Sequence, residues 1–211
     1  FLQEGYAFGY LLAAAAYLLV SQGLGLSWRW LFALSIVPAL ISLLIRTRVE
    51  ESAVWKESRE TMKVTSTGFK DVFLNAKVLR RFGYLIVLMT AFNWMSHGTQ
   101  DVYPTFLKAT DQGGAGLAES TALIIAIIYN IGAIIGGLTF GALSERIGRR
   151  HAIATAAAIA LPVIPLWLYA ASPVWLAIGA FLIQFAIQGA WGVVPVHLNE
   201  LSPDAVRGTF P

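Results

Sequence analysis

The sequence predicts an all-α membrane protein. Hydrophobic residues make up 57% of its 211 residues and charged residues only 13%, whereas soluble domains carry about 25% charged residues. The mean hydropathy is +0.66. Six stretches are apolar over roughly the 20 residues that a helix needs to cross a bilayer core of about 30 Å. They cover residues 5–20, 28–45, 82–107, 121–143, 152–171 and 174–198.

Small residues in two of these stretches predict close helix packing. Glycine lets neighbouring helix backbones approach, because it has no side chain to hold them apart. The spacing of glycines is suited to this in the fourth and first stretches, at Gly132, Gly136, Gly137 and Gly141 and at Gly5 and Gly9. Prolines also occur in or near the stretches, where neighbouring groups must satisfy the freed carbonyls.

The basic residues predict the orientation in the membrane. If the six helices alternate in direction, thirteen of the fifteen Lys and Arg fall on one side, in 46–81, 145–150 and the tail to Pro211. A positive excess marks the cytoplasmic side. We therefore expect a multi-pass protein of the plasma or inner membrane with both chain ends in the cytoplasm. The net charge of +3 follows from this topology and requires no nucleic-acid partner.

Residues 46–81 are expected to connect two helical bundles. Their mixed charges and helical spacing predict one or two short helices at the membrane surface; a regulatory role is the alternative. A boundary is expected near 65–68. Residues 1–45 would then end the first bundle, and residues 82–211 would belong to the second.

The composition also limits the chemistry. The chain has no Cys, which excludes disulfides and thiolate metal sites, and its three His are too far apart in sequence to suggest a metal site by spacing. No pairing of a nucleophile with a base is apparent. We expect neither a cofactor nor enzymatic activity, and the lipid bilayer is the expected surrounding.

The third stretch contains an unusually polar segment, NWMSHGTQDVYPT, at residues 93–105. At 100° per residue, five of its polar side chains fall within roughly 140° and form one face. They are Asn93, Ser96, His97, Gln100 and Asp101. An ionisable residue inside a span costs several kcal/mol unless it faces water or a partner, so His97 and Asp101 are candidate functional residues. The alternative is a structural hydrogen-bond cluster between helices. Thr99 and Thr105 point elsewhere and are expected to bond to backbone carbonyls.

Other polar residues of the later stretches are weaker candidates. Either they line a cavity or they form hydrogen bonds and packing contacts between helices, and the sequence favours neither interpretation. These residues are Tyr129, Asn130, Gln184, Gln188 and Trp191. His151 is expected to be solvated, and His197 to lie near the charged residues at the cytoplasmic boundary.

Two motifs on the predicted cytoplasmic side resemble those of a known family. GALSERIGRR, at 141–150, resembles the G-x-L-A-D-R-x-G-R-R/K signature of the major facilitator superfamily, with Ser144 and Glu145 in place of Ala and Asp. NELSPDAVRGT, at 199–209, resembles the acidic, Pro, Arg-Gly pattern that follows the fourth and tenth helices of that superfamily.

Charges in these two motifs predict a cytoplasmic gate. Glu145 with Arg146, and Glu200 with Arg207, are expected to pair in one conformation and to separate in another. The expected gate comprises Glu145, Arg146, Arg149, Arg150, Glu200 and Arg207. Ordinary solvated loop charges are the alternative interpretation.

The resemblance also numbers the helices. The order of the motifs implies a major facilitator superfamily helical bundle in which the six stretches are helices five to ten of an expected twelve. We therefore expect the chain to be part of a larger polypeptide that functions as a monomer once complete.

The polar segment resembles a second, more specific pattern. Its residues match the N-x-x-[S/T]-H-x-[S/T]-Q-D-x-x-x-T signature of lactate and pyruvate permeases in the sialate:proton symporter family. This resemblance implies proton-coupled symport of a short monocarboxylate by alternating access. It implies that His97 and Asp101 bind substrate and couple the proton, and that Asn93 and Gln100 contact the substrate.

Elementary chemistry agrees with that implication. A carboxylate that travels with a proton carries no net charge through a medium of low dielectric constant. An imidazole exchanges its proton near neutral pH, and a carboxylate one turn away forms a coupled pair with it. Ser96 would supply a further neutral donor. No predicted span has Lys or Arg at its centre, so any fixed cation is expected in other helices. The alternatives are a symporter for sialic acid or another larger organic acid, and a membrane acid sensor that does not transport.

Overall fold

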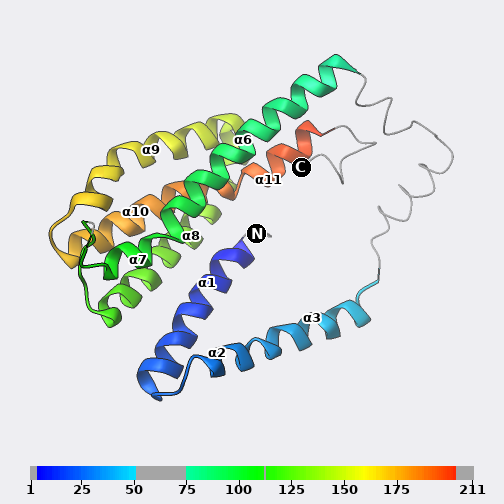
Figure 1. The fold of residues 1–211 in the computed structure, drawn as a ribbon. Coiled ribbons are helices and arrows are strands. Elements are labelled where there is room, and N and C mark those ends of the chain that lie inside the picture. Colours follow the sequence, from blue (N-terminus) through cyan, green and yellow to red (C-terminus); the bar gives the residue numbers. More distant parts are fainter. Residues whose placement is uncertain (1–3, 51–74, 112, 203–211) are drawn as a thin grey trace.

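The computed structural model describes residues 4–50, 75–111 and 113–202, which form helices with no strand among them (Figure 1). Residues 4–50, called the first part below, contain α1 (Glu4–Tyr17), a π-helical turn η1 (Leu18–Gly23), α2 (Arg29–Leu34) and α3 (Ile36–Arg48). The described residues from 75 to 202, called the second part, contain α6 (Ala76–Gln100), α7 (Tyr103–Lys108), α8 (Glu119–Ile147), α9 (Arg149–Tyr169), α10 (Pro173–Trp191) and α11 (Val194–Leu201). Most of the predicted connector, with the expected boundary near 65–68, lies outside the described residues.

The predicted all-α membrane architecture is confirmed. Five described segments are long and apolar enough to cross a membrane: Gly5–Gly23, Arg29–Arg48, Glu119–Ile147, Arg149–Tyr169 and Pro173–Leu201. They correspond to five of the six predicted spans. The remaining prediction, 82–107, falls on α6 and α7. Helix α6 is 25 residues long, which is long enough to cross a membrane. Its polar residues, rather than its length, exclude it from these five segments.

The predicted span 82–107 is broken at Asp101 and Val102, and Pro104 explains the break. Proline has no N–H, so the carbonyl of Gln100 cannot accept the helical bond from residue 104. Helix α6 ends at Gln100, and the amides of Thr105 and Phe106 instead donate to the carbonyl of Val102, each at 3.1 Å.

The same spacing recurs between α10 and α11. Trp191 is the last residue of α10, and Pro195 lies four residues later in the first turn of α11. In both places the axis of a predicted span changes where a proline removes a backbone donor.

Helices α8 and α10 pack closely at the centre of the second part. A Cβ added to Gly132 would lie 2.5 Å from the carbonyl oxygen of Phe181, and one added to Gly136 would overlap the backbone of Phe185. A Cβ on Gly192 would likewise lie 2.8 Å from the carbonyl oxygen of Gly137. Close packing at these glycines of α8 is therefore confirmed.

Three other glycines make no close contact within the part of the chain that the structure describes. A Cβ added to Gly5, Gly9 or Gly141 would have no atom within 4 Å. Helix α1 nevertheless packs along α8, so it uses other residues of its surface. The spacing of glycines therefore marks a close helix contact only where the glycines face the neighbouring helix.

Helices α2 and α3 contribute no buried residue to the described structure. They run apart from the bundle of α6 to α11 (Figure 1), and their large apolar side chains are exposed, among them Phe32 and Leu40. Such a surface is suited to lipid or to further apolar helices.

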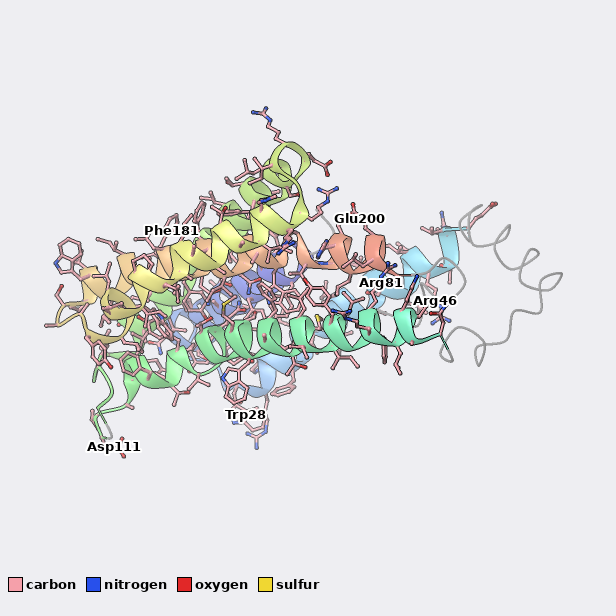
Figure 2. The ribbon with its side chains drawn as sticks, turned by 90° about the horizontal axis from the view of Figure 1, so that it is seen from above. Trp28, Arg46, Arg81, Asp111, Phe181 and Glu200 are labelled. Carbon is pink, nitrogen blue, oxygen red and sulfur yellow. The ribbon has the colours of Figure 1, made fainter. Side chains whose placement is uncertain are left out.

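Charged residues gather at one end of the described structure. Arg46, Arg81 and Glu200 lie toward one end, and Asp111 lies at the other (Figure 2). A guanidinium nitrogen of Arg81 donates to the carbonyl of Leu201 at 3.3 Å, which joins the start of α6 to the end of α11. This grouping agrees with the sidedness predicted from the sequence.

The contact between α8 and α10 predicts a position-dependent response to alanine. Gly136→Ala would place a methyl group in the backbone of Phe185, and overpacking of this kind costs about 1–3 kcal/mol. We expect a lower melting temperature for the purified protein in detergent, measured by fluorescence-detected size exclusion after heating. Gly141→Ala, on the same helix but with open space around it, is the matched control. Equal melting temperatures for the two variants would contradict this view of the interface.

Candidate functional site

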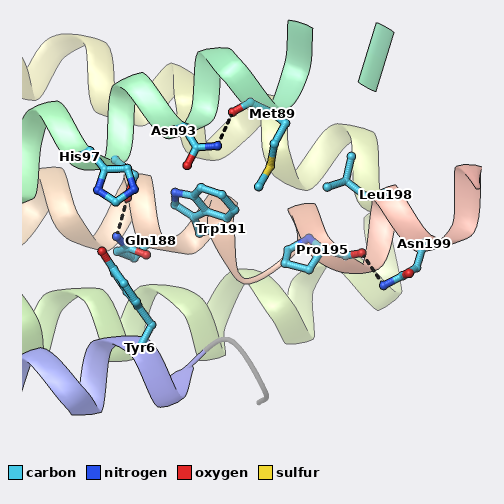
Figure 3. A pocket seen from close by; sticks show the side chains of 10 residues that line it. Tyr6, Met89, Asn93, His97, Gln188, Trp191, Pro195, Leu198 and Asn199 are labelled. Atoms are coloured by element: carbon cyan, nitrogen blue, oxygen red, sulfur yellow. Dashed lines mark hydrogen bonds between the residues drawn. The ribbon is translucent and has the colours of Figure 1, made fainter. Parts of the chain in front are cut away.

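A cavity of about 370 Å³ lies between α1, α6, α10 and α11 (Figure 3). Three of the five predicted site residues line it, together with side chains from the other three helices. The lining consists of Tyr6, Met89, Asn93, Ser96, His97, Gln188, Trp191, Pro195, Leu198 and Asn199. None of these ten residues is Lys or Arg, so His97 is the one lining side chain that can become cationic.

The break between α10 and α11 shapes one wall of the cavity. Gln188 and Trp191 come from the last turn of α10, and Pro195 and Leu198 come from α11 after the break. Tyr6 reaches toward this wall from α1 (Figure 3). Residues far apart in the sequence thus meet where a helix loses its continuous hydrogen bonding.

The predicted polar face of α6 is divided between the interior and the cavity. Measured from Ser96 at 100° per residue, Gln100 lies at about 40°, Asn93 at about 60°, His97 at about 100° and Asp101 at about 140°. The residues at small angles are buried, and those at large angles are exposed. Ser96 and Gln100 are 3% and 1% exposed, Asn93 is half-buried, and His97 and Asp101 are exposed.

His97 and Asp101 form a close pair on the exposed edge of this face. Nδ1 of His97 lies 2.8 Å from Oδ2 of Asp101, with the side chains 52% and 42% exposed. Neither side chain is fully covered by the described residues. Asp101 is not part of the cavity lining, but it is connected to the cavity through His97.

Two tyrosines of α1 form a chain of hydrogen bonds that ends at Asp101. The hydroxyl of Tyr10 donates to Oδ1 of Asp101 at 3.0 Å, and the hydroxyl of Tyr6 donates to that of Tyr10 at 3.2 Å. Both carboxylate oxygens of Asp101 consequently have a partner. The sequence analysis missed these tyrosines. Their spacing of four residues places them on one face, but the sequence does not show that this face meets α6.

The buried edge of the polar face forms an amide network. Nε2 of Gln188 donates to Oγ of Ser96 at 3.0 Å and to Oε1 of Gln100 at 3.1 Å. Nε2 of Gln100 donates to Oδ1 of Asn130 at 3.5 Å. Gln100, predicted to contact substrate, is thus absent from the cavity lining and holds Gln188 in place instead. Gln188 belongs to both the network and the lining.

The remaining candidates separate into two groups. Thr99 donates to the carbonyl of Met95 at 2.8 Å, as predicted, and also accepts from Gln184 at 3.3 Å. Gln184 and Asn130 therefore form hydrogen bonds between helices, and Tyr129 is buried. Gln188 and Trp191 line the cavity.

The charged residues of the predicted gate are organised around Arg149. Its guanidinium group lies 2.7 Å from Glu145 and 3.2 Å from Glu200, and it donates to Oγ of Ser144 at 2.6 Å. Glu145, in the last turn of α8, pairs with Arg149, the first residue of α9, rather than with its neighbour Arg146, because the turn at Gly148 brings the start of α9 back to the end of α8. These contacts join α8, α9 and α11.

Gly148 allows this arrangement. Its φ of 88° lies in the left-handed region that favours glycine, and it joins the end of α8 to the start of α9. Within the part of the chain that the structure describes, Arg146 and Arg150 are exposed and form no ion pair. Arg207 lies outside that part.

The two remaining histidines lie near this cluster. His151 is exposed, as expected. His197 is half-buried and lies within electrostatic range of Glu200 and Arg149, which agrees with its expected place beside the charged residues.

Comparison with known proteins places the chain in a family. The family model of the Major Facilitator Superfamily matches residues 2–210. The cis,cis-muconate transport protein of Acinetobacter baylyi is 27% identical over 99% of this chain and 50% of its own length. The sialic acid transporter NanX of Escherichia coli is 27% identical over 99% of this chain and 49% of its own length.

A third relative matches a shorter part. The carboxylic acid transporter protein homolog of Saccharomyces cerevisiae is 35% identical over 60% of this chain and 20% of its own length. The chain thus spans half or less of the length of these curated relatives. No solved structure shows significant similarity to it. Since the family model matches nearly every residue, the chain belongs to the major facilitator superfamily.

Proposed function

We propose that the chain forms helices five to ten of a proton-coupled symporter for a short monocarboxylate such as lactate or pyruvate, which works by alternating access. Residues 1–45 would end its first bundle, residues 46–81 would connect the bundles in the cytoplasm, and residues 82–211 would belong to the second. The carrier would work as a monomer in the plasma membrane. The observation that best supports this proposal is the partly exposed His97–Asp101 pair, of which His97 lines a cavity together with Asn93 and Ser96.

The pair can carry the coupled proton. Imidazole is a group that gains and loses a proton near neutral pH, and Nδ1 of His97 lies 2.8 Å from the carboxylate of Asp101. Because Nδ1 of His97 faces Asp101, its Nε2 is left to donate toward a substrate. A protonated His97 would therefore attract a carboxylate anion, and loss of the proton would weaken that attraction.

Neutral groups of the cavity complete the expected binding site. Asn93 uses one amide hydrogen to donate to the carbonyl of Met89 at 3.0 Å, and an amide nitrogen has a second hydrogen to offer. The hydroxyl of Ser96 accepts from Gln188 and still has its own proton to donate. Two neutral donors and one switchable cation are thus available on α6.

The cavity supports a small substrate. Ligand pockets commonly measure about 300–1,000 Å³, and this one lies near the lower limit at about 370 Å³. It contains no fixed cation, so we propose that a residue outside this chain supplies one. In a medium of low dielectric constant, an anion that moves with a proton avoids the penalty of carrying net charge.

A cytoplasmic gate is part of the same proposal. The ion pairs of Arg149 with Glu145 and Glu200 hold the ends of three helices together. We propose that Arg146, Arg150 and Arg207 exchange partners around this cluster as the carrier changes conformation.

The relatives include transporters of organic acids and of sugars, so they leave the cargo open. Two of them are described as transporters of cis,cis-muconate and sialic acid, which are larger than lactate. A symporter for a larger organic acid is therefore the second candidate. A membrane sensor that binds the acid without moving it is the third.

Replacing either member of the pair is expected to abolish proton-coupled accumulation. His97→Ala removes the group that exchanges the proton, and Asp101→Asn removes the charge that stabilises it. In proteoliposomes containing the full-length carrier, an inward proton gradient should drive uptake of labelled lactate by the wild type and not by either variant.

Two substitutions of the same kind serve as controls. His151→Ala and Asp111→Asn change exposed residues outside the cavity, so uptake should be retained. Normal pH-dependent uptake by both His97→Ala and Asp101→Asn would refute the assigned roles. Lactate binding by the wild type without substrate-dependent proton flux would identify a sensor instead.

Competition is expected to separate the two classes of cargo. If the small cavity sets the limit on size, unlabelled lactate or pyruvate should inhibit uptake of labelled lactate, whereas cis,cis-muconate and sialic acid should inhibit it weakly. The measurement is the concentration of each acid that halves initial uptake in proteoliposomes. Stronger inhibition by either bulky acid would favour the alternative cargo.

A further inference from the structure

Tyr10 forms a hydrogen bond between α1 and the pair proposed to carry the proton. Its hydroxyl donates to Oδ1 of Asp101 at 3.0 Å, whereas His97 occupies Oδ2 at 2.8 Å. The carboxylate is thus held from two directions. One of its partners moves with α6, and the other moves with α1.

The two helices fall on opposite sides of the proposed bundle boundary. Tyr10 and Asp101 are 91 residues apart, and the proposed connector lies between them. Helix α1 packs along α8, and a second hydrogen bond joins the same two helices where Tyr17 donates to Glu119 at 2.6 Å. The hydroxyl of Tyr10 therefore reaches Asp101 only while α1 keeps this place against the second part.

We propose that Tyr10 is a positioning residue that makes proton binding at Asp101 and His97 depend on the relative position of the two bundles. This inference rests on the proposed function as a proton symporter. With the proton on His97, Asp101 is ionised in both states of the pair, and the hydroxyl of Tyr10 takes up part of the negative charge that would otherwise face the imidazolium alone, so contact with α1 favours the deprotonated pair. When the bundles move and the hydroxyl withdraws, the pair holds a proton more readily.

The same relation acts in reverse. Linkage between two equilibria is reciprocal, so a contact that favours deprotonation is itself strengthened by deprotonation, by the same factor. Loss of the proton would then draw α1 toward α6, and gain of the proton would release it. One hydrogen bond would thereby connect the chemical step to the conformational step.

Other titratable groups lie near Asp101, but none of those described both bonds to it directly and belongs to the other bundle. His97 lies on the same helix and moves with it. Tyr6 contacts Tyr10 rather than Asp101, and Tyr129 of α8 lies within electrostatic range of Asp101 but donates no described hydrogen bond to it. Among the described groups, Tyr10 alone combines a direct bond with a position on the other bundle.

Tyr10→Phe tests the proposal because it removes the hydroxyl and keeps the ring. The ionised carboxylate loses a donor, so the site should release its proton at a higher pH. Uptake of lactate by the full-length carrier falls as pH rises through this release. The midpoint of that fall should therefore shift upward by about one pH unit, which corresponds to a roughly tenfold change.

Tyr17→Phe is the matched control. It removes the same group from the same helix and also breaks a hydrogen bond to a carboxylate of the second part, but it lies outside the cavity lining. Its midpoint should equal that of the wild type. Lactate binding at acidic pH, measured by calorimetry on each purified variant, establishes that the site has folded.

Tyr10→Gln supplies a second test, because it restores a donor without the ring. A midpoint nearer to the wild type than that of Tyr10→Phe supports the role of the hydroxyl. The proposal is overturned if Tyr10→Phe keeps the wild-type midpoint, if Tyr17→Phe shifts it equally, or if Tyr10→Gln matches Tyr10→Phe. The proposed function itself would be refuted if uptake by the wild type did not depend on pH, or if the His97 and Asp101 variants showed normal uptake.

Discussion

The arrangement of α6 follows from one constraint: a polar group in an apolar phase must either find a partner or reach water. The angular position of each residue around the helix decides whether it is buried with a partner or exposed. Ser96 and Gln100 face α10 and are satisfied by Gln188, whereas His97 and Asp101 lie about 100° further round and are satisfied by each other and by Tyr10. The hydrogen bonds of the buried edge thus fix the position of α6, and the exposed edge carries the two residues proposed to bind the proton. The proposed proton-exchanging site would need both, because a mobile helix could not keep two donors aimed at one substrate.

The cavity borders the interruption between α10 and α11, and close packing nearby makes this interruption tolerable. Gly132 and Gly136 bring α8 against α10, and this contact provides a rigid support for the last turn of α10. Beyond it, Pro195 prevents the helix from continuing along the same axis, so Trp191 and Leu198 can border one space. Interrupted helices are found at membrane depth where they line a cavity or are covered by protein, and both conditions are met here.

Periodicity and residue type predicted the helices well, and they predicted the site in part. Five spans and the backbone bond of Thr99 required only local reasoning. The break after Gln100 was missed because hydropathy does not register the donor that Pro104 lacks. The burial of Gln100 was missed because a helical wheel gives angles between residues but not the direction of the neighbouring helix. For the same reason, the partner of Glu145 needed the geometry of the turn at Gly148, and the part played by Tyr10 needed the position of α1.

The contacts of α1 differ in kind from those inside the second part, and the difference bears on how a carrier could move. Helices α8 and α10 meet backbone to backbone, and separating them would expose apolar surface and leave voids. Among the described residues, side-chain hydrogen bonds from α1 and η1 to the second part run from Tyr10, Tyr17 and Gln22 to the carboxylates of Asp101 and Glu119. Water can replace such bonds at little net cost, because the free energy of an exchanged hydrogen bond is small compared with that of an unmade one. An interface of this type can separate and re-form while the helices on either side stay intact. In the proposed carrier, the boundary across which the bundles move would therefore coincide with the place where a proton is bound, so a change in charge at Asp101 would act directly on the contact that must break.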